Sequence, residues 1–189
     1  GCVEDVAKDK VEATVDEAKS EAPKAEGQAW KVDTANSSLR ALGAKVTETH
    51  PIDFKTWEGE VTVNGSEVTG IGFTVDMATL EADHPKLTEH LKNEDFFDVP
   101  NHPKSTFQST SISAGGEGGS HTVTGNLTIR GASKEVTFPA TIALDGGTVK
   151  ANTEFAINRQ DFGVVYPGRP DNLIQDNVVL TIAFVANKP

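Results

Sequence analysis

Cysteine is almost absent from this 189-residue chain: Cys2 is its only one, so no disulfide can form within the chain. Positive charge is also scarce, because 17 Lys and Arg oppose 28 Asp and Glu and leave a formal net charge of −11. Such an acidic chain suits the phosphate backbone of nucleic acids poorly, and we predict no nucleic-acid partner. The sequence also lacks an apolar run of about 18 residues, which excludes a membrane-spanning helix.

Motifs of catalysis are missing as well. The five histidines form no HExxH pattern, and neither CxxC nor GxSxG occurs. We therefore predict a protein that is not an enzyme and has no cofactor. A metal site at His84, His90 and Asp95 is an alternative, because histidine and carboxylate groups are common zinc ligands. Arg159 and Asp161 in NRQDFG are expected to pair or to hold the turn that follows.

Gly1-Cys2 resembles the processing site of a bacterial lipoprotein, in which the cysteine receives a diacylglyceryl group. Cys2 is therefore the predicted lipidation site. The lipid would tether an exported protein to a membrane of the bacterial cell envelope, as a periplasmic or outer-membrane lipoprotein. A cloning remnant or an inert terminal cysteine is the alternative interpretation.

Residues 1–29 are predicted to be a charged tether, distinct from a domain at 30–189. Val11, Val15 and Ala18 recur at helical spacing with Ala22, but this apolar stripe is narrow. The pattern predicts a fraying helix or a disordered segment, with a partner-binding helix as the alternative. Because such a segment buries little surface, its deletion is expected to leave the melting temperature nearly unchanged.

From Trp30 onward, apolar and polar residues alternate as they do in strands with one buried face. Asn64-Gly65 separates two such segments and favours a tight hairpin, because both residues tolerate positive φ. Many short strands joined by polar turns are typical of an antiparallel barrel or sandwich, and the short connections favour an up-and-down barrel.

Residues 80–104 interrupt this alternation. Pro85 and Leu91 belong to a predicted short helix with the proline in its first turn. The segment NEDFFDVPNHP follows, and so long a connection within a hairpin meander is uncommon unless it covers something. Phe96 and Phe97 are therefore predicted to close one end of the barrel, either as a plug or as a lid over an interior cavity.

The segment HLKNEDFFDVPNHPKSTF (90–107) resembles a motif of the YceI-like family of bacterial secreted lipid-binding proteins. TGNLTIRGASKEVTFP (124–139) and FAINRQDFGV (155–164) resemble further family motifs in the same order, and KVTETHPIDF (45–54) fits a common variant. The resemblance covers residues 30–187. It implies an eight-stranded, lipocalin-like antiparallel barrel with a short helical insertion, whose apolar interior holds a polyisoprenoid, quinone or fatty amphiphile.

The expected function is thus non-catalytic binding, storage or transport of such a lipid, with a homodimer left open. Many family members place a large aromatic residue near Ala41, so the smaller side chain is expected to widen or reshape one end of the channel. Arg159 has a second candidate role, holding the polar head of the ligand. The candidate lipid-binding residues are Phe73, Val75, Leu91, Phe96, Phe97, Phe107, Leu127, Ile129, Phe138, Phe155, Arg159, Phe162 and Ile182.

An eight-stranded barrel is just wide enough either to be packed shut or to hold one small ligand. A structural or partner-binding lipoprotein with a packed barrel is therefore the competing interpretation.

Overall fold

Residues 1–19 and 24–189 are described by a computed structural model, and they form an all-β fold with a single α-helix. The main sheet contains β1 (Thr14–Glu17), β2 (Gln28–Lys31), β3 (Ser38–Ala44), β4 (Thr49–Phe54), β5 (Trp57–Asn64), β6 (Glu67–Asp76), β7 (Leu80–Ala82), β8 (Lys104–Ala114), β9 (His121–Ile129), β10 (Ala132–Asp145), β11 (Thr148–Asn158) and β14 (Asn177–Asn187). A separate hairpin is made by β12 (Gly168–Arg169) and β13 (Asn172–Leu173). The helical elements are α1 (Pro85–Lys92) and the 3-10 turns η1 (Thr34–Asn36), η2 (Met77–Thr79) and η3 (Arg159–Phe162).

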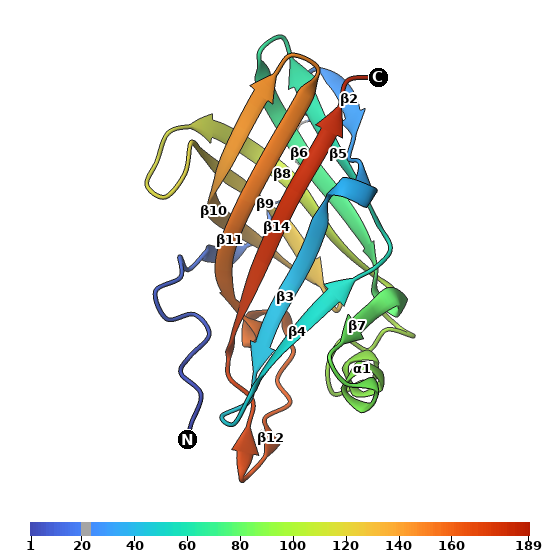
Figure 1. Cartoon of the computed structure of the whole chain (residues 1–189), viewed down its shortest axis with the longest axis vertical. Coiled ribbons are helices and arrows are strands. Elements are labelled where there is room, and N and C mark those ends of the chain that lie inside the picture. Colours follow the sequence, from blue (N-terminus) through green and yellow to red (C-terminus); the bar gives the residue numbers. More distant parts are fainter. Residues whose placement is uncertain (20–23) are drawn as a thin grey trace.

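The antiparallel strands follow the order β2-β5-β6-β8-β9-β10-β11-β14-β3-β4-β7, with β1 paired to β10 outside this path. Figure 1 shows that the sheet curls, so that β10, β11, β14 and β3 face β5, β6, β8 and β9 across the interior. Long strands alternate as predicted: Val136, Phe138, Ala140 and Ile142 of β10 are all buried. The antiparallel, barrel-like all-β architecture expected from the sequence is therefore confirmed.

The number of strands differs from the expected eight, because the main sheet is 12-stranded. The additional members include short strands at the ends of the path, such as β2 with 4 residues and β7 with 3. Segments of this length carry too few residues to show an alternating pattern.

The hairpin between β5 and β6 lies close to where the sequence predicted it. Its loop is shifted by one residue, because Asn64 still pairs with Glu67 and the two connecting residues are Gly65 and Ser66. Gly65 has a φ of 63°, a left-handed conformation that glycine adopts without steric cost. One positive-φ residue at the first loop position is sufficient for a tight hairpin.

Within the N-terminal segment Thr14–Glu17 form strand β1, where a fraying helix or a disordered segment was expected. Thr14 pairs with Thr137 in β10, and the Ala13 N–H donates to the Ala156 carbonyl at 2.9 Å. The Ala156 N–H in turn donates to the Val11 carbonyl at 2.7 Å. Residues 11–17 thus run between β10 and β11, whose own pairing is confined to 141–145 and 148–152.

This position explains why the helix prediction was wrong for the described part of the segment. Where β10 and β11 part, their backbone groups need partners, and an inserted strand supplies them. A narrow apolar stripe would stabilise a helix far less than pairing with β10 and β11 stabilises a strand. Tertiary pairing therefore overrides the local helix propensity. Ala22, the last position of the predicted stripe, lies outside the described residues.

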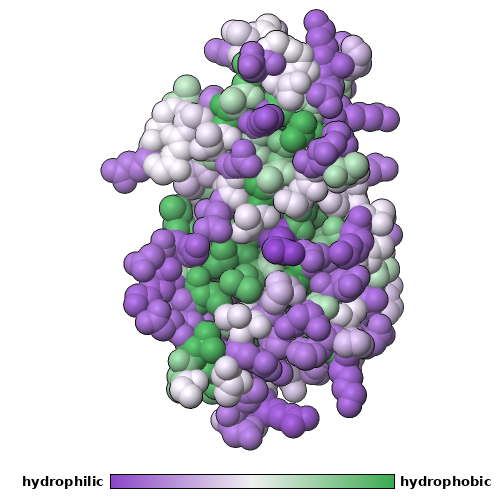
Figure 2. All heavy atoms as spheres, in the orientation of Figure 1, coloured by the Kyte–Doolittle hydropathy of each residue, from purple (hydrophilic) through white to green (hydrophobic). Residues whose placement is uncertain are grey.

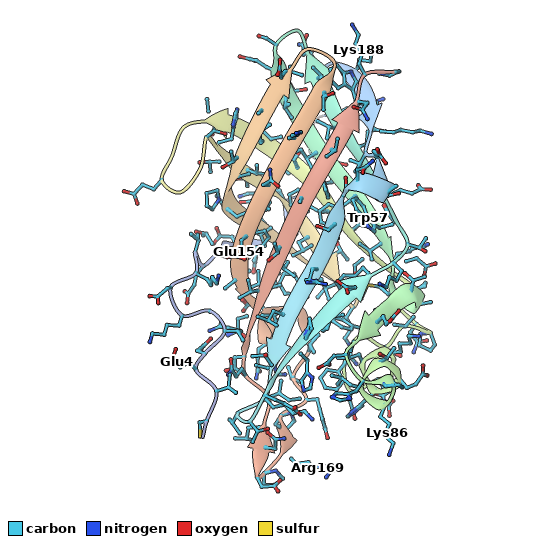
Figure 3. All side chains as sticks on the ribbon, viewed as in Figure 1. Glu4, Trp57, Lys86, Glu154, Arg169 and Lys188 are labelled. Carbon is cyan, nitrogen blue, oxygen red and sulfur yellow. The ribbon has the colours of Figure 1, made fainter. Side chains whose placement is uncertain are left out.

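Side-chain contacts also attach the N-terminal segment to the sheet. Ala7 is buried against Ala156 and Val179. Lys10 Nζ lies 2.8 Å from Glu154 Oε1, and Figure 3 shows Glu154 on the side of the sheet along which this segment runs. Ala7 is the one buried residue among residues 1–19, so the segment buries little surface, as expected, and is attached mainly by backbone hydrogen bonds.

The predicted helix after Pro85 is confirmed as α1, and with β7 it lies at the lower end of the sheet in Figure 1. The Phe97 N–H donates to the Leu91 carbonyl at 3.0 Å, which folds the chain back on the helix. Arg130 Nη1 donates to the Phe96 carbonyl at 2.8 Å and ties the segment to the turn after β9. Of the helices in the described part of the chain, none has the length and apolarity needed to span a bilayer.

Candidate functional site

A cavity of about 140 Å³ lies within the curled sheet, at the end covered by α1 and the segment that follows it. Its walls come from β3, β4, β6, β8, β9, β11 and β14, and the segment after α1 covers it. Of the candidate lipid-binding residues, those that line this cavity are Phe73, Val75, Leu91, Phe96, Phe97, Leu127, Ile129, Arg159, Phe162 and Ile182.

Phe107, Phe138 and Phe155 do not line the cavity, which corrects their predicted place in the channel wall. They are buried in an aromatic stack with ring centroids 5.7 Å apart for Phe107 and Phe138 and 4.2 Å apart for Phe138 and Phe155. Phe73 joins this stack, 5.4 Å from Phe107, and also lines the cavity. Inward-facing residues of the strands therefore line the cavity near α1 and form packed core farther from α1.

Gly125 makes room for this stack. A Cβ at this position would lie 2.5 Å from Phe107 Cζ and 2.6 Å from the Gln108 carbonyl oxygen, closer than real contacts allow. A glycine inside a strand commonly marks such a close approach. The packed part of the interior therefore depends on Gly125, and only the part towards α1 remains open.

The structure also adds cavity residues that the sequence did not single out. On β3, β4 and β14 most of the apolar additions lie at alternating positions, a pattern that could have identified them. The apolar additions are Leu39, Ala44, Ile52, Phe54, Met77, Leu87, Ile157, Val164, Ile174, Val178 and Leu180. Ala41, which the sequence did single out, also lines the cavity, and its effect on the width of the channel stays a prediction. Polar additions are Lys45, His50 and Ser105.

Arg159 is buried at the edge of the cavity and is held by backbone carbonyls. Its Nη1 donates to the Val164 carbonyl at 2.6 Å, and its Nε donates to the Gln175 carbonyl at 3.0 Å. Burial lowers the pKa of Arg159, and Asp176, with its carboxylate 3.6 Å away, acts in the opposite direction. The expected pairing with Asp161 is therefore replaced by one with Asp176, and the guanidinium holds the loop between η3 and β14.

A second cavity of about 210 Å³ adjoins the first, since Lys45, Leu87, Phe96 and Ile174 line both. We call this second cavity the outer chamber. Its remaining walls are largely polar and include Arg169, which Figure 3 shows at the lower end of the molecule. The apolar cavity thus continues towards this end through a more polar compartment.

Phe96 is one of the residues that line both cavities. Its ring lies 4.8 Å from the ring of His90 and 5.4 Å from that of Tyr166. His90 Nε2 lies 2.9 Å from Asp95 Oδ2, which fixes the imidazole. His84 does not join them, because it is close to His50, and among the described residues no metal-binding group of three His, Cys, Asp or Glu is found. The geometry supports a closing element here and does not support the metal alternative.

The fold and the cavity define a curled β-sheet protein with an apolar chamber at one end. Residues 30–186 match the YceI-like domain, and the chain belongs to this family. A UPF0312 protein of Pseudomonas putida (strain W619) is 34% identical over 123 residues, which span 61% of this chain and 64% of that protein. A UPF0312 protein of Pseudomonas fluorescens (strain SBW25) is 32% identical over 135 residues, 67% of this chain and 70% of that protein.

Solved structures share the fold. BcnA of Burkholderia cenocepacia superimposes with a TM-score of 0.72 and 27% identity, covering 82% of this chain and 99% of BcnA. A polyisoprenoid binding domain from Saccharophagus degradans gives a TM-score of 0.68 at 12% identity, covering 85% of this chain and 98% of that domain. At that identity the second likeness shows the fold alone.

Proposed function

We propose that the protein binds a long-chain amphiphilic lipid, such as a polyisoprenoid, without catalysing a reaction. The observation that carries this proposal is the apolar wall of the cavity, which most of the candidate residues share. A polyisoprenoid binding domain with the same fold supports the choice of ligand class. Polyisoprenoids, quinones and fatty amphiphiles all offer the long apolar chain that such a wall accommodates.

The size of the cavity indicates how such a chain would fit. A dry apolar cavity of about 150 Å³ takes a molecule the size of benzene. The cavity of about 140 Å³ therefore matches a short part of a lipid chain. A longer chain would continue into the outer chamber or displace Phe97, which is only partly buried. Covering about ten methylene groups contributes roughly 8 kcal/mol, near micromolar affinity before association costs.

Storage or transport in the bacterial cell envelope, with a lipid anchor at Cys2, is part of the same proposal. Cys2 is exposed, and the next residue, Val3, donates its N–H to the Val46 carbonyl at 2.7 Å. Lys45, which precedes Val46 in the sequence, lines both cavities. An anchor at Cys2 would thus hold the cavity end of the molecule near the membrane.

A packed structural or partner-binding lipoprotein remains the second candidate, favoured by the aromatic stack that fills the rest of the interior. Organic extraction of the purified full-length protein, followed by mass spectrometry, separates the two. A stoichiometric prenyl chain, quinone or fatty amphiphile is the expected result. Protein that purifies without a bound lipid and then takes up no added lipid would contradict lipid binding and favour the packed alternative.

A further inference from the structure

Residues 3–19 run along the outside of the curled sheet (Figure 1) and are held there by hydrogen bonds more than by burial. Ala7 is the one buried residue among them. Ala13 and Val15 pack, partly buried, against the core of the barrel, and most of the other side chains of this segment are exposed. We call residues 3–19 the strap.

Two side-chain amides clamp the strap near its ends. Gln175 Oε1 accepts the Val6 N–H at 3.0 Å, and its Nε2 donates to the Glu4 carbonyl at 3.0 Å. Asn126 Oδ1 accepts the Lys19 N–H at 3.3 Å, and its Nδ2 donates to the Lys19 carbonyl at 3.1 Å. A side-chain amide has both an acceptor and donors, so each clamp binds the backbone of the strap and does not depend on its side chains.

Between the clamps, the strap is bound as an added strand. Thr14 pairs with Thr137 of β10, and both the N–H and the carbonyl of Ala156 in β11 bond to the strap. Addition of a strand to a sheet edge is a recurrent way of binding peptides, in which main-chain hydrogen bonds supply the affinity. The two clamps and the seam between β10 and β11 therefore have the features of a peptide-binding groove, occupied by the chain's own residues.

The groove and its occupant belong to different parts of the chain. The YceI-like domain begins at residue 30, so the strap lies outside it, whereas Asn126, Ala156 and Gln175 lie inside it. Without the strap, β10 still pairs with β9, and β11 still pairs with β14 along its whole length. Release of the strap therefore breaks no pairing between the strands of the domain, and local segments open at a lower free energy than the whole fold.

We propose that this groove binds the strap reversibly, so that the protein alternates between a docked and a released form with the same folded barrel. The docked form keeps Cys2 close to the cavity end, because the Val3 N–H donates to the Val46 carbonyl. In the released form, residues 3–19 extend at about 3.3 Å per residue and reach roughly 55 Å. With the lipid anchor proposed at Cys2, docking would set the distance between the cavity and the membrane. This last step rests on the proposed function, and reversible docking does not.

Hydrogen exchange of the lipid-free, full-length protein tests the release. The Ala156 N–H bonds to the strap, so the N–H groups of Phe155 and Ile157 point to the other side, towards β14. Relative to their rates in an unfolded chain, we expect Ala156 to exchange at least tenfold faster than these two neighbours, because local release alone exposes it. Equal exchange at the three positions would overturn the proposal, since the strap would then leave only when the barrel unfolds.

A distance measurement follows the strap directly. Nitroxide labels are attached at Cys2, the only cysteine, and at position 47 after Thr47→Cys, an exposed position next to Val46. The docked form should give a short distance between the labels, and the released form a broad distribution of long distances. We expect the short distance to predominate in the wild-type strap and groove, with a minor long-distance fraction.

Variants of the clamps then test what holds the strap. Gln175→Ala and Asn126→Ala each remove two hydrogen bonds and should raise the long-distance fraction several-fold, with slow exchange retained at Phe155 and Ile157 as evidence of a folded barrel. Asn187→Ala is the matched control, because it removes a hydrogen-bonded amide at the other end of β14 and should leave the fraction unchanged. An unchanged fraction in both clamp variants would overturn the proposal. Lipid binding, which neither measurement uses, would still stand.

Discussion

At the scale of single residues, Gly125 shows how one missing side chain shapes the interior. Gly125→Ala would press a methyl group into Phe107 and the Gln108 carbonyl, at 2.5 and 2.6 Å. Because backbone cannot yield as a flexible side chain does, we expect a loss of about 1–3 kcal/mol in the free energy of unfolding. Denaturant unfolding measures it. Gly43→Ala is the control, since a Cβ there meets nothing within 4 Å and should leave stability nearly unchanged.

Phe97 and Phe138 provide a second residue-scale comparison, between cavity wall and packed core. Phe138→Ala removes a ring from the aromatic stack and is expected to cost about 3–5 kcal/mol. Phe97→Ala should cost less, because its ring borders open space and is only partly buried. It should instead speed the release of a fluorescent prenyl probe. Probe off-rates measured beside the unfolding of lipid-free protein test this; an unchanged off-rate in a strongly destabilised Phe97→Ala would identify Phe97 as a plug.

At the scale of elements, the N-terminal segment is part of the sheet. Deleting residues 3–17 removes β1 and leaves backbone groups of β10 and β11 without the partners that Thr14 and Ala13 provide. We expect a clear fall in the melting temperature, the opposite of what composition alone predicted. Thermal unfolding followed by circular dichroism measures it. A melting temperature equal to that of the full chain would show that the segment is a tether after all.

The ion pair between Lys10 and Glu154 contributes little to this attachment. The hydrogen bond from Lys10 lowers the pKa of Glu154. The ion pair therefore stabilises the folded protein at pH values above the ordinary glutamate pKa, and this stabilisation is lost as the pH falls through the lowered pKa of Glu154. Both side chains are partly exposed, at 39% and 43%, and the pair is expected to be worth less than about 1 kcal/mol. Lys10→Met should lower stability slightly at pH 7 and not at pH 2. A large loss in the free energy of unfolding at pH 7 would contradict the small contribution expected of this ion pair.

Sequence patterns identified the long elements and missed the short ones for a physical reason. β10 has enough residues to show alternation, and α1 begins with a proline that suits a first turn. β1 and β7 have no such internal signal, because they exist through pairing with distant strands. The same limit applies to the site: Phe73 and Phe138 alternate alike in sequence, yet only Phe73 reaches the cavity. Which inward residue meets open space depends on the curvature of the whole sheet.

At the scale of the whole molecule, several features gather at one end. Val165 and Leu173 are large exposed apolar residues, and each adjoins a residue that lines the cavity, Val164 and Ile174. Figure 1 shows the N-terminus and the β12 hairpin at this end and the C-terminus at the other. Figure 2 shows polar residues over much of one face, with apolar residues between them in the lower half. An anchored protein would therefore present its cavity end to the bilayer.

The last prediction tests this orientation. Replacing Val165 and Leu173 together by serine removes exposed apolar side chains without touching the cavity wall, so the affinity for a soluble C15 lipid should stay within about twofold of wild type. Extraction of a fluorescent prenyl lipid from phosphatidylcholine vesicles should slow several-fold, because contact with the bilayer becomes less favourable. Ser113→Ala, in a strand away from this end, is the control and should extract at the wild-type rate. If the double variant also extracts lipid at that rate, Val165 and Leu173 do not contact the bilayer during uptake.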